Sequence, residues 1–133
     1  MGVSNPSSYE RKLIMIFEEE KIEYEREKTF SDLRRGLLRY DFFLPQKNVL
    51  IELQGQQHFY YIPKFHKGRG DFLKGQERDR KKISFALSHK IPLYCIPYWD
   101  MDSIRKSLDI FSEKFLARTR YFNDELYREH IKK

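Results

Sequence analysis

The stretch that decides the fold is residues 37–58, which read LLRYDFFLPQKNVLIELQGQQH. Two apolar runs, residues 37–44 and 49–53, are joined by residues 45–48 (PQKN), which have the length and composition of a hairpin turn. Leucine, β-branched and aromatic residues dominate both runs, as in a sheet that is buried on both faces. The stretch therefore predicts a buried β-hairpin at the centre of the domain.

Each run of this hairpin carries one acid, Asp41 in the first and Glu52 in the second. A carboxylate among apolar neighbours is costly unless something pairs with it. Because side chains alternate along a strand, Glu52 and Gln54 point to the same face, and a hairpin of this register can bring Asp41 beside them. The sequence predicts a small oxygen-rich pocket there.

These residues resemble the signature of the PD-(D/E)XK nuclease superfamily, an Asp followed on the next strand by Glu-x-Lys. Asp41 and residues 52–54 (ELQ) match this pattern, with Gln54 in the lysine place. The wider motifs YDFFLP, IELQGQQHF, RDRKK and IPLYCIPY resemble the branch that contains the very-short-patch-repair endonuclease and related phage and homing endonucleases. The likeness covers roughly residues 7–99.

The resemblance implies an α/β fold with three layers, in which a mixed four-stranded sheet is flanked by helices as in restriction endonucleases. It also implies metal-dependent hydrolysis of phosphodiester bonds in DNA. Mg²⁺, or Mn²⁺ in its place, prefers oxygen ligands. We expect Asp41 and Glu52 to supply carboxylates and Leu53 to supply its backbone carbonyl.

The missing lysine leaves open which group carries the positive charge, because the amide of Gln54 is uncharged and can only orient water. His58 and Lys82 are the two candidates. We favour His58, which lies where the relatives carry a histidine near the scissile phosphate. The case for Lys82 depends on the phase of a predicted helix.

Residues 7–10 (SSYE) form a capping box that opens a helix, since a hydroxyl and a Glu three residues later can satisfy each other's amides. Glu10 is therefore expected to be a cap. The relatives carry a Glu in the first helix, which implies that Glu10 also leans into the pocket as a third acid. The two roles are compatible.

A strand is expected over residues 22–30, a helix from Asp71 to about His89 and a last strand over residues 91–98. The helix is polar in the first half of its inward face, which points Gln76 and Asp79 toward the pocket beside Gln57 of the preceding loop. A second helix is expected to start at Asp102 or Ser103.

Five basic residues in two loops are candidate phosphate contacts, although each could equally be a solvated surface residue. They are Arg34, Arg35, Lys64, Lys67 and Arg69.

The composition fits one domain over residues 1–133, with a core of about residues 7–117 and a basic tail at 118–133 that can form a short helix. A net charge of +6 favours a polyanionic partner, and we expect duplex DNA. The rivals are a non-catalytic DNA-binding module and a nuclease that cleaves RNA. A homodimer is left open.

Cysteine content and the lack of a recognisable targeting segment lead us to expect an intracellular, cytoplasmic protein. Cys95 is the single cysteine, which gives no disulfide framework and no thiolate metal cluster. The first residues lack the features of a signal peptide, and no apolar stretch is long enough for a membrane span.

Overall fold

The structure is a computed structural model that describes residues 5–33, 38–56 and 61–98. Its elements are α1 (Ser8–Glu19), β1 (Glu25–Thr29), β2 (Arg39–Leu44), β3 (Val49–Gln54), α2 (Arg69–Ser88) and β4 (Leu93–Pro97). The expected second helix after Asp102 and the tail at 118–133 lie outside the described residues. Within the described ranges, no helix is long and apolar enough to cross a membrane.

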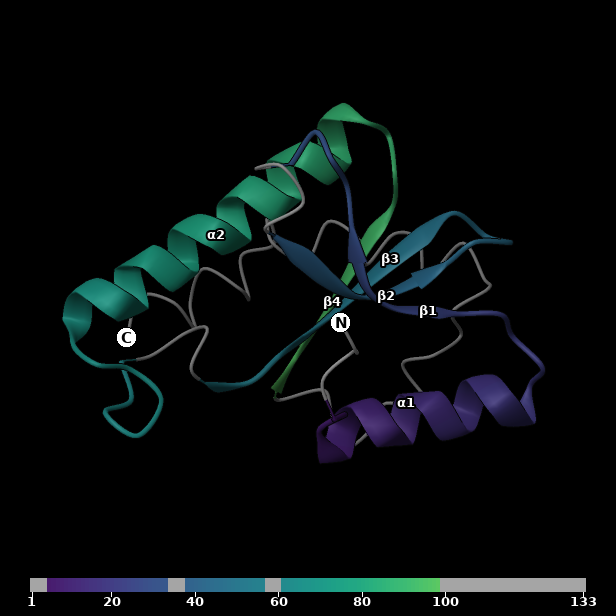
Figure 1. Ribbon diagram of the computed structural model, residues 1–133, viewed down its shortest axis with the longest axis horizontal. Coiled ribbons are helices and arrows are strands. Elements are labelled where there is room, and N and C mark those ends of the chain that lie inside the picture. The colour runs from purple at the N-terminus through teal and green to yellow at the C-terminus, as the bar shows by residue number, and fades with distance from the viewer. Residues whose placement is uncertain (1–4, 34–37, 57–60, 99–133) are drawn as a thin grey trace.

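The four strands form one mixed sheet in the order β1-β2-β3-β4. β1 pairs antiparallel with β2, β2 antiparallel with β3, and β3 parallel with β4. Helix α2 provides the crossover between the two parallel strands, as parallel pairing requires. In Figure 1, α1 and α2 lie on opposite sides of the sheet, which makes three layers. The expected α/β class is confirmed.

The sheet has an apolar core on each face. On the α1 side, residues of the helix pack against Phe42, Ile51 and Ile96 of three strands. On the α2 side, Phe85 and Ala86 pack with side chains of β2, β3 and β4. All six residues of β3 are buried, as predicted. β2 instead alternates between buried and more exposed positions.

The capping box and the hairpin turn also form as predicted. Ser7 Oγ accepts a hydrogen bond from the Glu10 amide at 3.2 Å, and Glu10 Oε1 accepts one from the Ser7 amide at 2.9 Å. The hairpin turn ends at Asn48, whose φ of 53° is left-handed. Asparagine tolerates this conformation better than most residues, so the turn chemistry agrees with the sequence.

Several boundaries differ from the sequence-based expectation. Helix α2 begins at Arg69 after Gly68, two residues before Asp71, whose carboxylate lies in the first turn and accepts from the Lys67 amide at 3.3 Å. β1 is shorter than expected because Ile22 and Tyr24 pack against the α1 core before the strand begins. The last strand is likewise confined to Leu93–Pro97.

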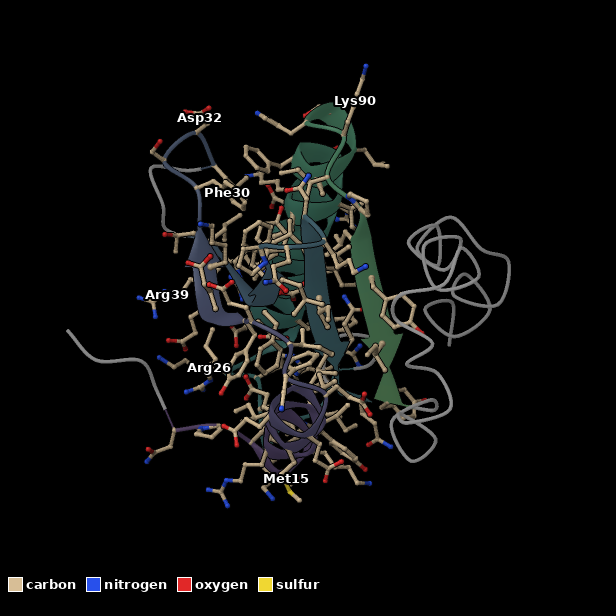
Figure 2. The ribbon with its side chains drawn as sticks, turned by 90° about the vertical axis from the view of Figure 1, so that its right-hand side faces the viewer. Met15, Arg26, Phe30, Asp32, Arg39 and Lys90 are labelled. Atoms are coloured by element: carbon tan, nitrogen blue, oxygen red, sulfur yellow. The ribbon has the colours of Figure 1, made fainter. Side chains whose placement is uncertain are left out.

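The packing of α1 predicts that Phe17→Ala lowers the free energy of unfolding by about 3–5 kcal/mol, the usual cost of emptying a buried aromatic site. Phe17 is fully buried, and its ring meets those of Tyr24 and Phe42 at 5.4 and 5.5 Å. Met15 on the same helix is 60% exposed and points away from the sheet in Figure 2. Met15→Ala is the matched control, and urea unfolding should place it within about 0.5 kcal/mol of the wild type. Equal losses in the two variants would contradict this packing.

Candidate active site

The backbone pairing of the central hairpin gives way to side-chain hydrogen bonds at Asp41 and Glu52. β2 and β3 pair from Leu44–Val49 to Phe42–Ile51. At the next residues, the Asp41 amide donates to Glu52 Oε1 at 2.9 Å, and the Leu53 amide donates to Asp41 Oδ2 at 2.8 Å. Each strand thus offers a carboxylate to an amide of the other strand. The two acids that the sequence predicts to be neighbours do lie together.

Strand β2 departs from regular alternation at this point. Tyr40 and Phe42 are two residues apart and would share a face in a regular strand, yet Tyr40 packs on the α2 side and Phe42 on the α1 side. In β1, Glu27 lies between the partners of Phe42 and Tyr40 and has a φ of 54°. Such left-handed backbone is uncommon for a residue other than glycine. Irregularities of this kind re-aim side chains, here the carboxylate of Asp41.

Helix α2 brings a lysine to the acid pair. Lys82 Nζ lies 3.0 Å from Glu52 Oε2, and the side chains of Lys82 and Glu52 are only 14% and 4% exposed. Tyr40 of β2 contacts the same lysine at two points. Its hydroxyl donates to the Lys82 carbonyl at 2.6 Å, and its ring centroid lies 5.5 Å from Lys82 Nζ. The ammonium is therefore positioned by an ion pair and by an aromatic ring together.

The environment shifts the protonation of these groups. Burial raises the pKa of Asp41 well above its ordinary value, and the negative charge of Glu52 adds to the effect, while the bond from the Leu53 amide and the charge of Lys82 act against it. Burial would lower the pKa of Lys82, but the attraction of Glu52 and Asp41 outweighs it, so the pKa of Lys82 is raised. Lys82 stays charged at neutral pH.

The donor atoms at this site suit a hard divalent cation. The carboxylates of Asp41 and Glu52 accept the hydrogen bonds described above and retain further lone pairs. Gln54, on the same face of β3 as Glu52, is 1% exposed, and its Oε1 has no hydrogen-bond partner in the described part of the chain. A buried acceptor of this kind can take a water or a cation. In the described ranges no three or more His, Cys, Asp or Glu side chains gather as a metal site, so any ion would depend on two carboxylates and neutral oxygens.

The other predicted residues fall into four groups. Glu10 is engaged in the cap of α1, yet its charge contributes to raising the pKa of Asp41, so it lies within electrostatic reach. Asp79 is buried, and its charge acts on Lys82, whereas Gln76 is partly exposed one turn earlier. The exposed Lys64, Lys67 and Arg69 lie in or beside the loop before α2. Arg34, Arg35, Gln57 and His58 lie outside the described residues.

Sequence reasoning missed two neighbours of the acids. Tyr40 precedes Asp41 directly, but regular alternation would have turned it away from α2. Cys95 is the register partner of Glu52 on β4 and is buried. Burial raises the pKa of its thiol well above the usual range, and Glu52 and Asp79 add to this, so the thiol remains protonated at neutral pH. The burial of Cys95 agrees with the apolar run in which it lies, but the sequence did not indicate that it pairs with Glu52.

Comparison with known proteins gives two partial matches. The chain is 33% identical over 61 residues to the uncharacterized protein 307L of Invertebrate iridescent virus 6, which covers 46% of this chain and 31% of the viral protein. It is 39% identical over 62 residues to the uncharacterized protein 094L of Frog virus 3, covering 46% of this chain and 40% of that protein. The chain thus spans less than half the length of either viral relative. No protein-family model and no solved structure matches it.

The raised pKa of Asp41 predicts a pH-dependent stability difference between the wild type and Asp41→Asn. A carboxyl whose pKa is higher in the folded than in the unfolded chain binds its proton more tightly when folded, so it costs stability as pH rises from about 4 through the folded pKa. Without divalent ions, Asp41→Asn should therefore be more stable than the wild type at pH 8, and the gap should shrink toward pH 4. Thermal unfolding in EDTA across this range measures the gap. A gap that does not change with pH would contradict the assigned shift.

Proposed function

We propose that this chain is a metal-dependent endonuclease that hydrolyses phosphodiester bonds in DNA. The observation that carries the proposal is the pair Asp41 and Glu52, two carboxylates held together across a hairpin with the ammonium of Lys82 on one of them. Burial and mutual repulsion make this pair costly for folding. A chain that needed only stability would gain by replacing such acids, so the pair supports a chemical role.

The oxygen-rich composition of the site supports a divalent cation as cofactor. Asp41, Glu52 and the carbonyl of Leu53 would hold Mg²⁺ or Mn²⁺, and the buried Oε1 of Gln54 would hold a water nearby. When bound, such an ion neutralises the phosphate and activates a water. This role accounts for two features at once, the repulsion between the acids and the unsatisfied amide oxygen.

Lys82 can take the role of the lysine in the Glu-x-Lys signature, which is replaced here by Gln54. That role is to stabilise the negative charge of the phosphorane. The phosphorane carries extra negative charge, and a fixed cation in a site of low dielectric stabilises it more than a cation in water. Lys82 is buried, charged and held by Glu52 and Tyr40, so little reorganisation is needed. Gln54 then remains free to orient water. We therefore assign the cationic role to Lys82 in preference to His58.

DNA is proposed as the substrate on two grounds. The chain has a net charge of +6 at neutral pH, which attracts polyanions and favours contacts to phosphate. The choice of DNA over RNA rests on the resemblance of roughly residues 7–99 to endonucleases that act on DNA.

The first test of this function is cleavage of supercoiled plasmid by the wild type and by Asp41→Asn. Cleavage should require Mg²⁺ or Mn²⁺, stop in EDTA and fall by at least about 10²-fold in the variant. Asp41→Asn is preferred to Glu52→Gln, because the latter leaves the buried Lys82 without its partner and should cost several kcal/mol of stability.

A second readout of the same site does not depend on activity. Mg²⁺ or Mn²⁺ should raise the melting temperature of the wild type and not that of Asp41→Asn, since an ion that binds only the folded state stabilises it. Wild-type cleavage rates in Asp41→Asn would show that the metal site is misplaced.

The identity of the cationic group can be decided by pH profiles. Lys82→Ala leaves the buried Glu52 without its partner, so its rate is compared at a temperature where circular dichroism shows the variant folded. There it should lower the cleavage rate by about 10²–10³-fold with little change in substrate affinity, and Lys82→Arg should restore part of it. The wild-type rate should not fall as pH rises between 6 and 8, because Lys82 keeps its charge there. A rate that falls through this range, together with an equal loss in His58→Ala, would return the role to His58 as cation or general acid.

A further inference from the structure

The loop that leads into α2 carries a group of rings and cations that the proposed cleavage chemistry does not use. We name it the aromatic-basic cluster. It consists of Tyr61, Lys64, Phe65, His66, Lys67, Arg69 and Phe72. In Figure 1 this teal loop lies beside the N-terminal end of α2, at the margin of the molecule.

The rings of the cluster form a connected platform. The rings of Tyr61 and His66 lie 5.9 Å apart, and His66 meets the ring of Phe72 of α2 edge-on at 5.4 Å. The guanidinium of Arg69 lies over Tyr61 at 5.3 Å. These contacts attach the loop to the first turn of α2, so its position is defined by packing.

Phe65 lies in the turn that precedes His66 and is exposed. The amides of Phe65 and His66 both donate to the Ile62 carbonyl at 2.9 Å, which closes a tight turn. The Ile62 amide in turn lies 2.9 Å from His66 Nδ1. Phe65 is nevertheless 55% exposed, the single aromatic among the large exposed apolar side chains of the described ranges. An ordered turn thus presents a large apolar ring to solvent.

The charges around Phe65 favour a nucleic-acid partner over a protein. Lys64 Nζ lies 5.7 Å from the centroid of the Phe65 ring, and Lys67, Arg69 and Lys74 are exposed nearby in the chain. Lysine is depleted at the centres of protein interfaces, whereas rings interleaved with cations suit bases and phosphates. Bases in a duplex are already covered on both faces by their neighbours. An exposed ring therefore finds a partner only in an unpaired, unstacked base.

From these observations we infer that the aromatic-basic cluster binds single-stranded DNA, with Phe65 stacking on an unpaired base and the cations contacting phosphates. This inference rests on the proposed action on DNA and adds a substrate class, a strand with unpaired bases. Arg69 and Lys82 are 13 positions apart on α2. Thirteen residues correspond to roughly 20 Å along a helix, so one strand can reach both the cluster and the acid pair.

The test measures binding in the Asp41→Asn background in EDTA, where the DNA stays intact. The probes are a labelled single strand of about 20 nucleotides, a strand of equal length with abasic sites throughout, and the corresponding duplex; about 20 nucleotides comfortably exceed the 20 Å span. Phe65→Ala should weaken binding of the normal single strand by roughly 5- to 150-fold, the range for losing one stacked base. Binding of the abasic strand and of the duplex should change less than about twofold.

Two controls separate stacking from other causes. Phe65→Trp keeps an aromatic ring, so it should bind the single strand as tightly as the parent protein with Phe65. A 2-aminopurine base in the strand should lose fluorescence on binding to the parent protein and to Phe65→Trp, but not on binding to Phe65→Ala. Met15→Ala removes an apolar side chain that is 60% exposed on α1 and should leave all three affinities unchanged.

Two results would overturn the inference. One is an unchanged single-strand affinity in Phe65→Ala, and the other is an equal loss on the single strand and the duplex. Neither bears on metal-dependent cleavage, which depends on Asp41. Conversely, selective single-strand loss in Phe65→Ala without any cleavage by the wild type would keep the binding site and reject the endonuclease.

Discussion

The exchange of hydrogen bonds between Asp41 and the strand of Glu52 is the constraint on which the rest of this structure depends. The two carboxylates join β2 and β3 where the backbone pairing ends, at 2.9 and 2.8 Å. Glu52 also forms an ion pair with Lys82 of α2, and the Tyr40 hydroxyl donates to the backbone carbonyl of the same lysine. One acid pair therefore connects the central hairpin with the helix that crosses over it. The fold and the candidate site share the same atoms.

Stability alone is a weak explanation for this arrangement. A buried ion pair such as Glu52 with Lys82 gains little over apolar residues of similar size, because both charges lose their hydration. The ionised form of Asp41 is disfavoured further by burial and by its neighbour Glu52. In the proposed function, a bound divalent cation would offset the cost at Asp41 by adding attraction to both carboxylates. The acid pair is therefore better explained by the proposed metal site than by stability alone.

The sequence predicted those features that depend on local rules. The hairpin at residues 37–54 followed from apolar patterning and turn residues, and the position of Asp41 beside Glu52 followed from the register that the turn imposes. The capping box between Ser7 and Glu10 was equally local. The left-handed backbone at Glu27 and the break in alternation between Tyr40 and Phe42 could not be predicted, since nothing in these residue types demands them. The break placed Tyr40 under α2, against the alternation rule.

The position of Lys82 could not be predicted from local sequence rules alone. From sequence, Lys82 depended on the phase of a helix whose start was misplaced by two residues, because the helix begins at Arg69 rather than Asp71. A shift of the start did not alter the phase, since the face of a helix is set by its packing. Phe85 and Ala86 anchor α2 on the sheet, and they fix Lys82 one turn earlier.

A lysine supplied by a helix differs physically from one supplied by a strand. A strand lysine in the place of Gln54 would be fixed by the ladder between β3 and β4. Lys82 instead reaches Glu52 only while α2 stays packed on the sheet, and the hydrogen bond from the Tyr40 hydroxyl to the Lys82 carbonyl at 2.6 Å helps to hold the helix there. Since α2 also carries Arg69 and Phe72 at its other end, a strand bound there would pull on the same rigid helix. If the proposed binding of a strand takes place there, α2 would link it mechanically to the position of the ammonium.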